Sequence, residues 1–291
     1  FNVETTQVDW STVSSQRINV NIDIHEKVVR SGTYNFLGCK LPVPTNLRTD
    51  MWRHLLDISE YSDHSICDLL QYGFPISYET NVPPSSSPRN HNNAHTFPHC
   101  VDEFIQNEIK LGATLGPFNS NPLCSHLYIS PLNSVPKKGN ANKRRIILDL
   151  SWPIGTSVND GIHKDSYLGE QIKVSYPSVD DFSNLIIQFG KGCLIFKTDL
   201  SRAYRQWPIC PGDINYLGYS WRNYFFIDRA PPFGLRSAAY ICQRITNAII
   251  YIYIYIYIDL LVSLVSIIWM ILLGLTLQTG LVQLMSICCP Y

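Results

Sequence analysis

FKTDLSRAYRQ, the segment from Phe196 to Gln206, organises the chain. An apolar run that begins at Cys193 leads into it and predicts a short buried strand, preceded by a turn at Gly190 and Gly192. The strand ends at Asp199. A lone carboxylate at a strand end that points into a cleft can hold a divalent cation, because hard cations prefer carboxylate oxygens. The segment therefore predicts a central strand with a metal ligand at its exposed end.

A companion segment, PPFGLRSAAYICQ from Pro231 to Gln243, follows farther along the chain. Its Pro-Pro-Phe-Gly start predicts a turn, and Gly234 lets the backbone come close to a ligand because no Cβ stands in the way. The residues from Leu235 to Ile250 predict a helix. We expect this helix to pack near the strand that ends at Asp199.

The two segments resemble motifs A and B of the reverse transcriptase palm. The finer resemblance is to retroelements of the DIRS type, which use a tyrosine recombinase for integration. Further segments agree in order and spacing, namely Val101–Phe118, Pro136–Ile162, Lys164–Glu170 and Pro177–Phe182. The resemblance covers roughly residues 30 to 250 and is specific, because several long strings agree rather than one short motif.

The resemblance implies an α/β (α+β) fold, namely the fingers and part of the palm of a right-hand DNA/RNA polymerase. It implies RNA-directed DNA synthesis from dNTPs on a primed RNA template, with Mg²⁺ as cofactor and an RNA/DNA primer–template as partner. We expect an N-terminal segment with short helices and a Pro/Ser/Asn-rich linker (1–100), a fingers-like subdomain (101–165), a partial palm (166–250) and an apolar tail (251–291).

Periodicity and turn residues predict the remaining local structure. Alternating apolar residues within 18–24 indicate an exposed strand or a partly ordered lead-in, and helical spacing within 50–72 predicts two short helices. Prolines, serines and asparagines make 80–99 a linker or long loop. An apolar stripe predicts a helix over 101–112, and 129–150 predicts an antiparallel hairpin with a basic turn.

The basic hairpin carries the first candidate ligand-binding residues. The resemblance identifies it with the fingers hairpin, whose Lys and Arg contact the phosphates of the incoming nucleotide. By position this role goes to Lys138 (or Lys137) and to Arg145. Arginine suits the task because its fork binds phosphate oxygens bidentately. Without the resemblance, a solvated basic turn is the better interpretation.

The palm segments supply the other candidates. The resemblance implies that Asp199 is a catalytic residue and metal ligand, where a metal pair activates the primer 3′-hydroxyl for in-line displacement. It implies that Tyr204 lies beneath the sugar and excludes a 2′-hydroxyl, and that Phe233 and Gly234 line the nucleotide pocket. The alternative for Tyr204 is a core aromatic near a strand end.

Three arginines near these segments are candidates for contacts with nucleic-acid phosphates, with a solvated face as the equal alternative: Arg202, Arg205 and Arg236. Residues 1–130 carry 8 Lys and Arg against 13 Asp and Glu, whereas residues 131–250 carry 15 against 9. A basic middle section fits contact with phosphates, although charge alone favours an ordinary solvated surface.

Several other polar residues have simpler interpretations. Asp149 and Asp160 stand beside polar turn residues and are predicted to form turns rather than to act in catalysis. Ser178 and Asp181 predict a helix N-cap. The Pro/Ser/Asn-rich loop and the residue after it also contain four possible zinc ligands: His91, His95, His99 and Cys100. Their spacing fits no closed zinc motif, which favours a solvated loop.

The cysteines and the start of the chain bear on its setting. The 9 cysteines are scattered without a CxxC pair, which indicates reduced thiols and an intracellular location in cytoplasm or nucleus. No signal peptide is visible, and the chain opens at Phe1 rather than at Met. We expect it to be a piece of something longer.

The tail departs from the resemblance. A palm needs a Tyr-x-Asp-Asp strand after the Phe-Gly turn, whereas Ile250–Ile258 reads IYIYIYIYI. A two-base DNA repeat would encode this run, and such repeats shift the reading frame easily. Tyr257–Leu260 imitates the motif weakly, with a single aspartate. We therefore expect truncation before the second catalytic aspartates, a frame-shifted tail and no polymerase activity.

Two other functions stay open from the sequence. One is a non-catalytic nucleic-acid-binding remnant. The other is a membrane-associated protein, because residues 249–278 hold one charge and would pass as a transmembrane helix, with the membrane contact through residues 260–278. We favour the frame-shifted tail, since a membrane anchor makes little sense on a reverse transcriptase.

Overall fold

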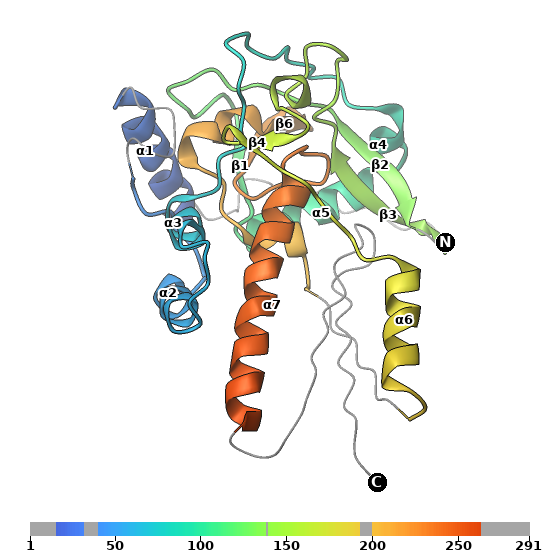
Figure 1. The fold of residues 1–291 in the computed structure, drawn as a ribbon. Coiled ribbons are helices and arrows are strands. Elements are labelled where there is room, and N and C mark those ends of the chain that lie inside the picture. Colours follow the sequence, from blue (N-terminus) through green and yellow to red (C-terminus); the bar gives the residue numbers. More distant parts are fainter. Residues whose placement is uncertain (1–15, 32–39, 138, 193–199, 263–291) are drawn as a thin grey trace. The chain divides into compact units, whose positions relative to one another are not determined.

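The computed structural model describes residues 16–31, 40–137, 139–192 and 200–262. Helices and antiparallel strands occur together, as Figure 1 shows, so the fold is mixed helix and sheet. The chain divides into two compact units, each built from three stretches of sequence. Unit 1 contains 1–47, 68–171 and 204–238, and unit 2 contains 48–67, 172–203 and 239–291.

Unit 1 contains every strand of the described residues. Its three-stranded antiparallel sheet has the order β1-β7-β6, and two further antiparallel pairs are β2–β3 and β4–β5. The strands are β1 (Thr114–Phe118), β2 (Leu132–Lys137), β3 (Asn140–Leu148), β4 (Ser166–Tyr167), β5 (Glu170–Gln171), β6 (Gly218–Trp221) and β7 (Tyr224–Asp228).

Helices complete unit 1. The α-helices are α1 (Gln16–Arg30), α4 (Asn92–Thr96) and α5 (Pro98–Lys110), and α3 (Ser65–Tyr72) belongs to it in its greater part. The 3₁₀ helices are η2 (Asn159–Gly161), η3 (Ala203–Gln206) and η4 (Pro211–Tyr216).

The core of unit 1 follows from alternation along its strands. On β3, Ile146 and Leu148 are buried, whereas Arg145 before them and Ile147 between them are half-buried, as expected where side chains alternate between two faces. Tyr219 of β6 stacks on Phe226 of β7 with ring centroids 5.3 Å apart, and both are fully buried. Burial of this aromatic area stabilises the sheet.

Unit 2 is helical in its described residues. It holds α2 (Thr49–Ile58), α6 (Val179–Phe189) and nearly all of α7 (Ala238–Val262). Arg244 of α7 donates from Nη2 to Asp63 Oδ1 at 2.8 Å, which ties the helix to the α2–α3 connection. Ser178 caps α6, because its hydroxyl accepts from the Asp181 N–H while the Asp181 carboxylate accepts from the Ser178 N–H.

Several sequence predictions are confirmed. Two short helices, α2 and α3, occupy residues 50–72, and α5 covers the helix expected over 101–112. The hairpin is β2–β3, and the Ser178 cap is present. Asp149 and Asp160 form turns, since their carboxylates accept from the backbone N–H groups of Ser151 and Ser157.

The interpretation of residues 18–24 as an exposed strand is wrong, because Gln16–Arg30 forms the helix α1. His25 and Val28 are buried, and Ile18 and Ile22 pack on the core, which is helical spacing. The alternation misled because Val20 is 48 % exposed. The face of α1 that packs on the core includes His25 among its apolar residues.

The loop expected over 80–99 contains more structure than predicted. Residues Asn92–Thr96 form α4, and Pro98 begins α5, where its missing N–H costs nothing. The histidines contact other side chains: His91 Nε2 lies 2.9 Å from Asp149 Oδ2, and His95 stacks on Trp221 at 5.5 Å between ring centroids.

The C-terminal helix begins and ends later than expected. It starts at Ala238 rather than Leu235 and continues through the Ile-Tyr repeat to Val262. Among the helices of the described ranges, none combines the length and hydropathy that a membrane span requires. The predicted strand over 194–199 and the tail from 263 onward lie outside the described residues. The predicted division of the chain at residues 100, 165 and 250 stays a prediction.

Candidate functional site

Three segments of unit 1 that are distant in sequence meet around one aromatic ring. Phe233, in the turn after β7, contacts the Tyr204 ring edge-on, with centroids 5.4 Å apart and an interplanar angle of 67°. The guanidinium carbon of Arg145, on β3, lies 5.6 Å from the Phe233 centroid, within range of a cation–π interaction. Two of the predicted nucleotide-binding residues, Tyr204 and Arg145, therefore each contact a third, Phe233.

Gly234 fixes how closely this turn approaches the hairpin. Its φ is +115°, and a Cβ built there would stand 2.4 Å from the Leu148 carbonyl oxygen, so only glycine fits. The turn consequently lies against the end of β3, the strand that carries Arg145. The fourth predicted residue is part of the same arrangement, although it acts through backbone shape.

Adjacent arginines of the hairpin do different work. Arg144 donates from Nε to Ser134 Oγ at 2.8 Å, and its guanidinium carbon lies 4.1 Å from the centroid of the Phe97 ring. Arg145, the next residue on the strand, faces the opposite side and is half-buried over Phe233. Alternation along the strand therefore places Arg144 against the hairpin itself and leaves Arg145 beside the Phe233–Gly234 turn.

Arg205 lies in a buried cluster rather than on a surface. Its side chain is 3 % exposed and pairs with Glu108 and Asp228, each at 2.8 Å. It also donates to Thr114 Oγ1 at 3.2 Å and to the Ala230 carbonyl at 3.0 Å. A second bond to Asp228, from Nη2 to Oδ1 at 2.8 Å, is the fifth, so all five N–H donors of the arginine are used.

The cluster has two electrostatic consequences. Burial lowers the pKa of Arg205, but the charges of Asp228 and Glu108 outweigh that effect and hold the pKa above its ordinary value. Burial raises the pKa of Asp228, and the Arg205 charge offsets part of the rise. Since no donor of Arg205 is left over, its placement favours a structural role over the predicted phosphate contact.

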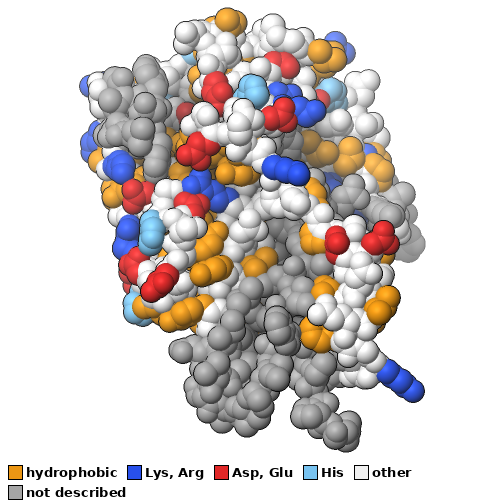
Figure 2. All heavy atoms as spheres, in the orientation of Figure 1, with side chains coloured by type: hydrophobic (Ala, Val, Ile, Leu, Met, Phe, Trp, Pro, Cys, Tyr) orange, Lys and Arg blue, Asp and Glu red, His pale blue; other side chains and the backbone are white. Residues whose placement is uncertain are grey.

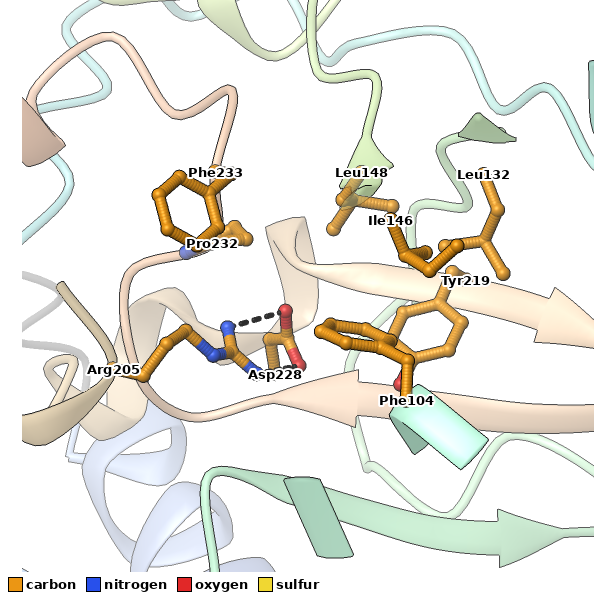
Figure 3. A pocket seen from close by; sticks show the side chains of 9 residues that line it. All are labelled: Phe104, Leu132, Ile146, Leu148, Arg205, Tyr219, Asp228, Pro232 and Phe233. Atoms are coloured by element: carbon orange, nitrogen blue, oxygen red, sulfur yellow. Dashed lines mark hydrogen bonds and ion pairs between the residues drawn. The ribbon is translucent and has the colours of Figure 1, made fainter. Parts of the chain in front are cut away.

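A pocket separates the ion pair from the hairpin. Figure 3 shows Pro232 and Phe233 across it from Ile146 and Leu148, with the Arg205–Asp228 ion pair along one side. Its empty space, open solvent included, is about 250 Å³. The complete lining is Phe104, Leu132, Ile146, Leu148, Arg205, Tyr219, Asp228, Pro232 and Phe233. The Pro232–Phe233 turn thus forms one wall of a pocket that is apolar except for the Arg205–Asp228 ion pair.

The remaining predicted residues are placed as follows. Arg236 is exposed, and its Nη1 donates to the Ile162 carbonyl at 2.8 Å. Arg202 is half-buried with a φ of 53° and belongs to unit 2. Lys138 and Asp199 lie outside the described residues.

Sequence reasoning missed two groups in this region. The partners of Arg205 came from separate segments, although Glu108 shared a face with Val101 and Ile105, and a carboxylate on an apolar face signals a buried pair. Asn159 also went unassigned, yet it is 4 % exposed and bonds to the Phe233–Gly234 turn. A buried asparagine, like a buried carboxylate, needs hydrogen-bonding partners and so indicates a contact with another segment.

The arrangement of acidic, basic and metal-binding side chains adds no second site to the part of the chain that the structure describes. Within the described ranges, no three or more His, Cys, Asp or Glu side chains come together as a metal site would require. On the face in Figure 2, basic and acidic side chains of the described residues are interspersed rather than gathered by sign.

Comparison with known proteins gives matches among solved structures alone. No family profile matches the sequence, and no curated protein matches it. The chain is similar to a foamy viral protease–reverse transcriptase in complex with double-stranded DNA, with 15% identity and a TM-score of 0.41 over 72% of this chain and 36% of that chain. It is similar to the native prototype foamy virus protease–reverse transcriptase, with 16% identity and a TM-score of 0.38 over 77% of this chain and 26% of that chain. This chain spans between about a quarter and two fifths of the length of four such reverse transcriptase structures.

Proposed function

We propose that this chain derives from the fingers and palm of a DIRS-like reverse transcriptase and binds an RNA/DNA primer–template together with a dNTP. The observation that supports the proposal is the convergence of Arg145, Tyr204, Phe233 and Gly234 around one turn. The resemblance assigns these residues to one ligand, and they come from separate segments of the chain to one turn.

The proposed roles follow from the chemistry of each side chain. Arg145 is half-buried, so part of its guanidinium can reach a triphosphate, which a planar fork binds bidentately. Tyr204 would lie under the sugar and discriminate against a 2′-hydroxyl. Lys138 is proposed to assist Arg145, and Arg202 and Arg236 are proposed to contact backbone phosphates.

Catalysis is proposed to be absent from this chain. Asp199 is the proposed Mg²⁺ ligand of the ancestral reaction, in which two-metal phosphoryl transfer needs several converging carboxylates. The sequence contains no Tyr-x-Asp-Asp, and its one adjacent pair of aspartates, Asp180 and Asp181, lies in the first turn of α6. Removing part of such a catalytic unit removes most of the rate.

The test is binding and extension on the purified chain. We expect weak binding of a primed RNA template, with an affinity that falls steeply as salt rises, because phosphate contacts release counterions. A complementary dNTP should tighten the complex more than the other three dNTPs or the matching ribonucleotide. We expect no primer extension with Mg²⁺ or Mn²⁺.

The controls separate the parts of the proposal. Binding that ignores the identity of the nucleotide would indicate a nucleic-acid-binding remnant without a nucleotide site. Absence of binding at low salt would refute the proposal. Primer extension by the present chain would show that another carboxylate, such as Asp259, completes a catalytic site.

A further inference from the structure

A side-chain amide holds the Phe233–Gly234 turn through two hydrogen bonds to its backbone and to the residue that follows Leu235. Asn159, in η2, donates from Nδ2 to the Gly234 carbonyl at 2.7 Å, and its Oδ1 accepts from the Arg236 N–H at 2.9 Å. Its Nδ2 also donates to Ser151 Oγ at 2.8 Å. One buried amide therefore closes on the backbone to either side of Leu235.

This bonding pattern resembles a peptide-to-peptide pair. A carboxamide presents one acceptor and two donors, so it can satisfy a carbonyl and an N–H of the same segment at once. The segment 234–236 precedes α7, which begins at Ala238. Asn159 supplies an acceptor for the Arg236 N–H, two residues before the helix, and a donor for the Gly234 carbonyl, so it holds the backbone at the end of the turn.

The turn that carries Asn159 is itself firmly held. The Asp160 carboxylate accepts from the Ser157 N–H at 3.0 Å and from its hydroxyl at 2.7 Å. The Gly161 carbonyl accepts from the Glu79 N–H at 2.8 Å. Asn159 is thus anchored to a structure that does not depend on the Phe233–Gly234 turn, so it can impose a position on that turn.

We propose that Asn159 is a positioning residue that sets the Phe233–Gly234 turn where the nucleotide site needs it. It acts through the Gly234 carbonyl, and the adjacent Phe233 ring then meets Tyr204 and Arg145. Asn159 does not have to touch the ligand. The functional part of this inference rests on the proposed function, whereas the positioning part concerns the free protein.

Unit 1 offers a matched control. Asn90 is 9 % exposed, donates from Nδ2 to the Ser220 carbonyl at 2.8 Å and accepts at Oδ1 from the Leu132 N–H at 2.8 Å. It makes the same kinds of bond as Asn159, but it joins β6 to the start of β2. Asn90→Ala and Asn159→Ala therefore delete the same chemistry at two places.

The experiment is hydrogen exchange, measured by mass spectrometry on the full chain without ligand. We expect Asn159→Ala to speed exchange at Arg236 at least tenfold, because that amide loses its acceptor, whereas Asn90→Ala should act at Leu132 and leave Arg236 unchanged. Unchanged exchange at Arg236 in Asn159→Ala, or an equal rise in Asn90→Ala, would overturn the proposal.

A second variant covers the case in which Asn159→Ala does not fold. Asn159→Asp keeps the acceptor for the Arg236 N–H and loses the donor to Gly234. We expect Arg236 to stay protected in this variant while the Phe233 ring loses its fixed position. That loss would appear as a changed near-ultraviolet circular dichroism signal, and an unchanged signal would contradict the proposed positioning.

Nucleotide binding supplies the functional readout. On a primer–template, Asn159→Ala should lose about tenfold in dNTP affinity, while Asn90→Ala should lose less than about twofold, since two backbone hydrogen bonds hold the turn. An equal loss of dNTP affinity in both variants would contradict a positioning role of Asn159 in binding. If the wild-type chain binds no primer–template, the proposed function fails, and the exchange measurement still decides whether Asn159 holds the turn.

Discussion

Unit 1 contains two arginines that are bonded in opposite ways. Arg145 is half-buried over Phe233, and no carboxylate pairs with it among the described residues. Arg205 is buried between Glu108 and Asp228, and all its donors are bonded. Both arginines had been assigned to phosphates. The difference indicates that Arg205 has no donor left for a ligand, and it is the reason why we propose a phosphate contact for Arg145 and none for Arg205.

The comparison predicts its largest effect at Arg205. Replacing it by Met keeps the volume but leaves Glu108 and Asp228 buried without their cation, which costs about 3–5 kcal/mol of the free energy of unfolding. Chemical denaturation followed by tryptophan fluorescence measures the change. Arg89, an exposed arginine of the same unit, is the control, and Arg89→Met should change stability by less than about 0.5 kcal/mol. A similar small change for Arg205→Met would show that the cluster is not the support we describe.

The next effect concerns the turn itself. Gly234→Ala adds a Cβ 2.4 Å from the Leu148 carbonyl at a φ of +115°, and should cost about 3 kcal/mol and weaken dNTP binding. Gly155 has a φ of +85° with nothing within 4 Å of its added Cβ, so Gly155→Ala should cost only about 1–2 kcal/mol and spare binding. Equal costs at the two positions would mean that the close approach to Leu148 is unimportant.

A smaller, pH-dependent effect belongs to a neutral buried group. The His25 ring donates from Nδ1 to the Pro211 carbonyl at 2.6 Å and accepts at Nε2 from the Ser125 hydroxyl at 2.8 Å. Burial lowers the pKa of His25, and the Pro211 carbonyl opposes this in part. Below about pH 6.5 the unfolded chain therefore binds a proton that the folded chain does not, and stability falls as pH falls.

His25→Asn isolates this contribution. Asparagine keeps a donor for the Pro211 carbonyl and does not titrate. Unfolding measured from pH 7.5 to pH 5 should show a steeper loss of stability for the wild type than for His25→Asn. The Arg205 cluster is present in both the wild type and His25→Asn, so it cannot cause a difference between their pH profiles. Parallel pH profiles would show that His25 is not held neutral by burial.

How much the sequence could predict depended on the range of the interactions. Local signals predicted the β2–β3 hairpin and the Ser178 cap, because turn residues and capping chemistry act within a few positions. The convergence on Phe233 followed from a resemblance that covers separate segments. The role of Arg205 could not be predicted, since its partners Glu108 and Asp228 lie 97 and 23 residues away and only the fold brings them together.

Period also had limits as a guide. In α1 the buried stripe included His25, so counting apolar residues alone favoured alternation and the wrong element. In α7 the Ile-Tyr repeat alternates like a strand, yet it continues a helix that begins at Ala238. In both cases the neighbouring structure outweighed the local period.

The central proposal is that Arg145 contacts the triphosphate of the incoming nucleotide while Arg205 contacts no phosphate. The most direct measurement is the affinity for a primer–template with its complementary dNTP, titrated over a series of salt concentrations, for the wild type, Arg145→Ala and the control Arg89→Ala. Our account predicts weaker binding for Arg145→Ala, a salt dependence reduced by about one counterion, an unchanged free energy of unfolding, and wild-type behaviour for Arg89→Ala. Equal affinities and equal salt slopes for the wild type and Arg145→Ala would contradict it.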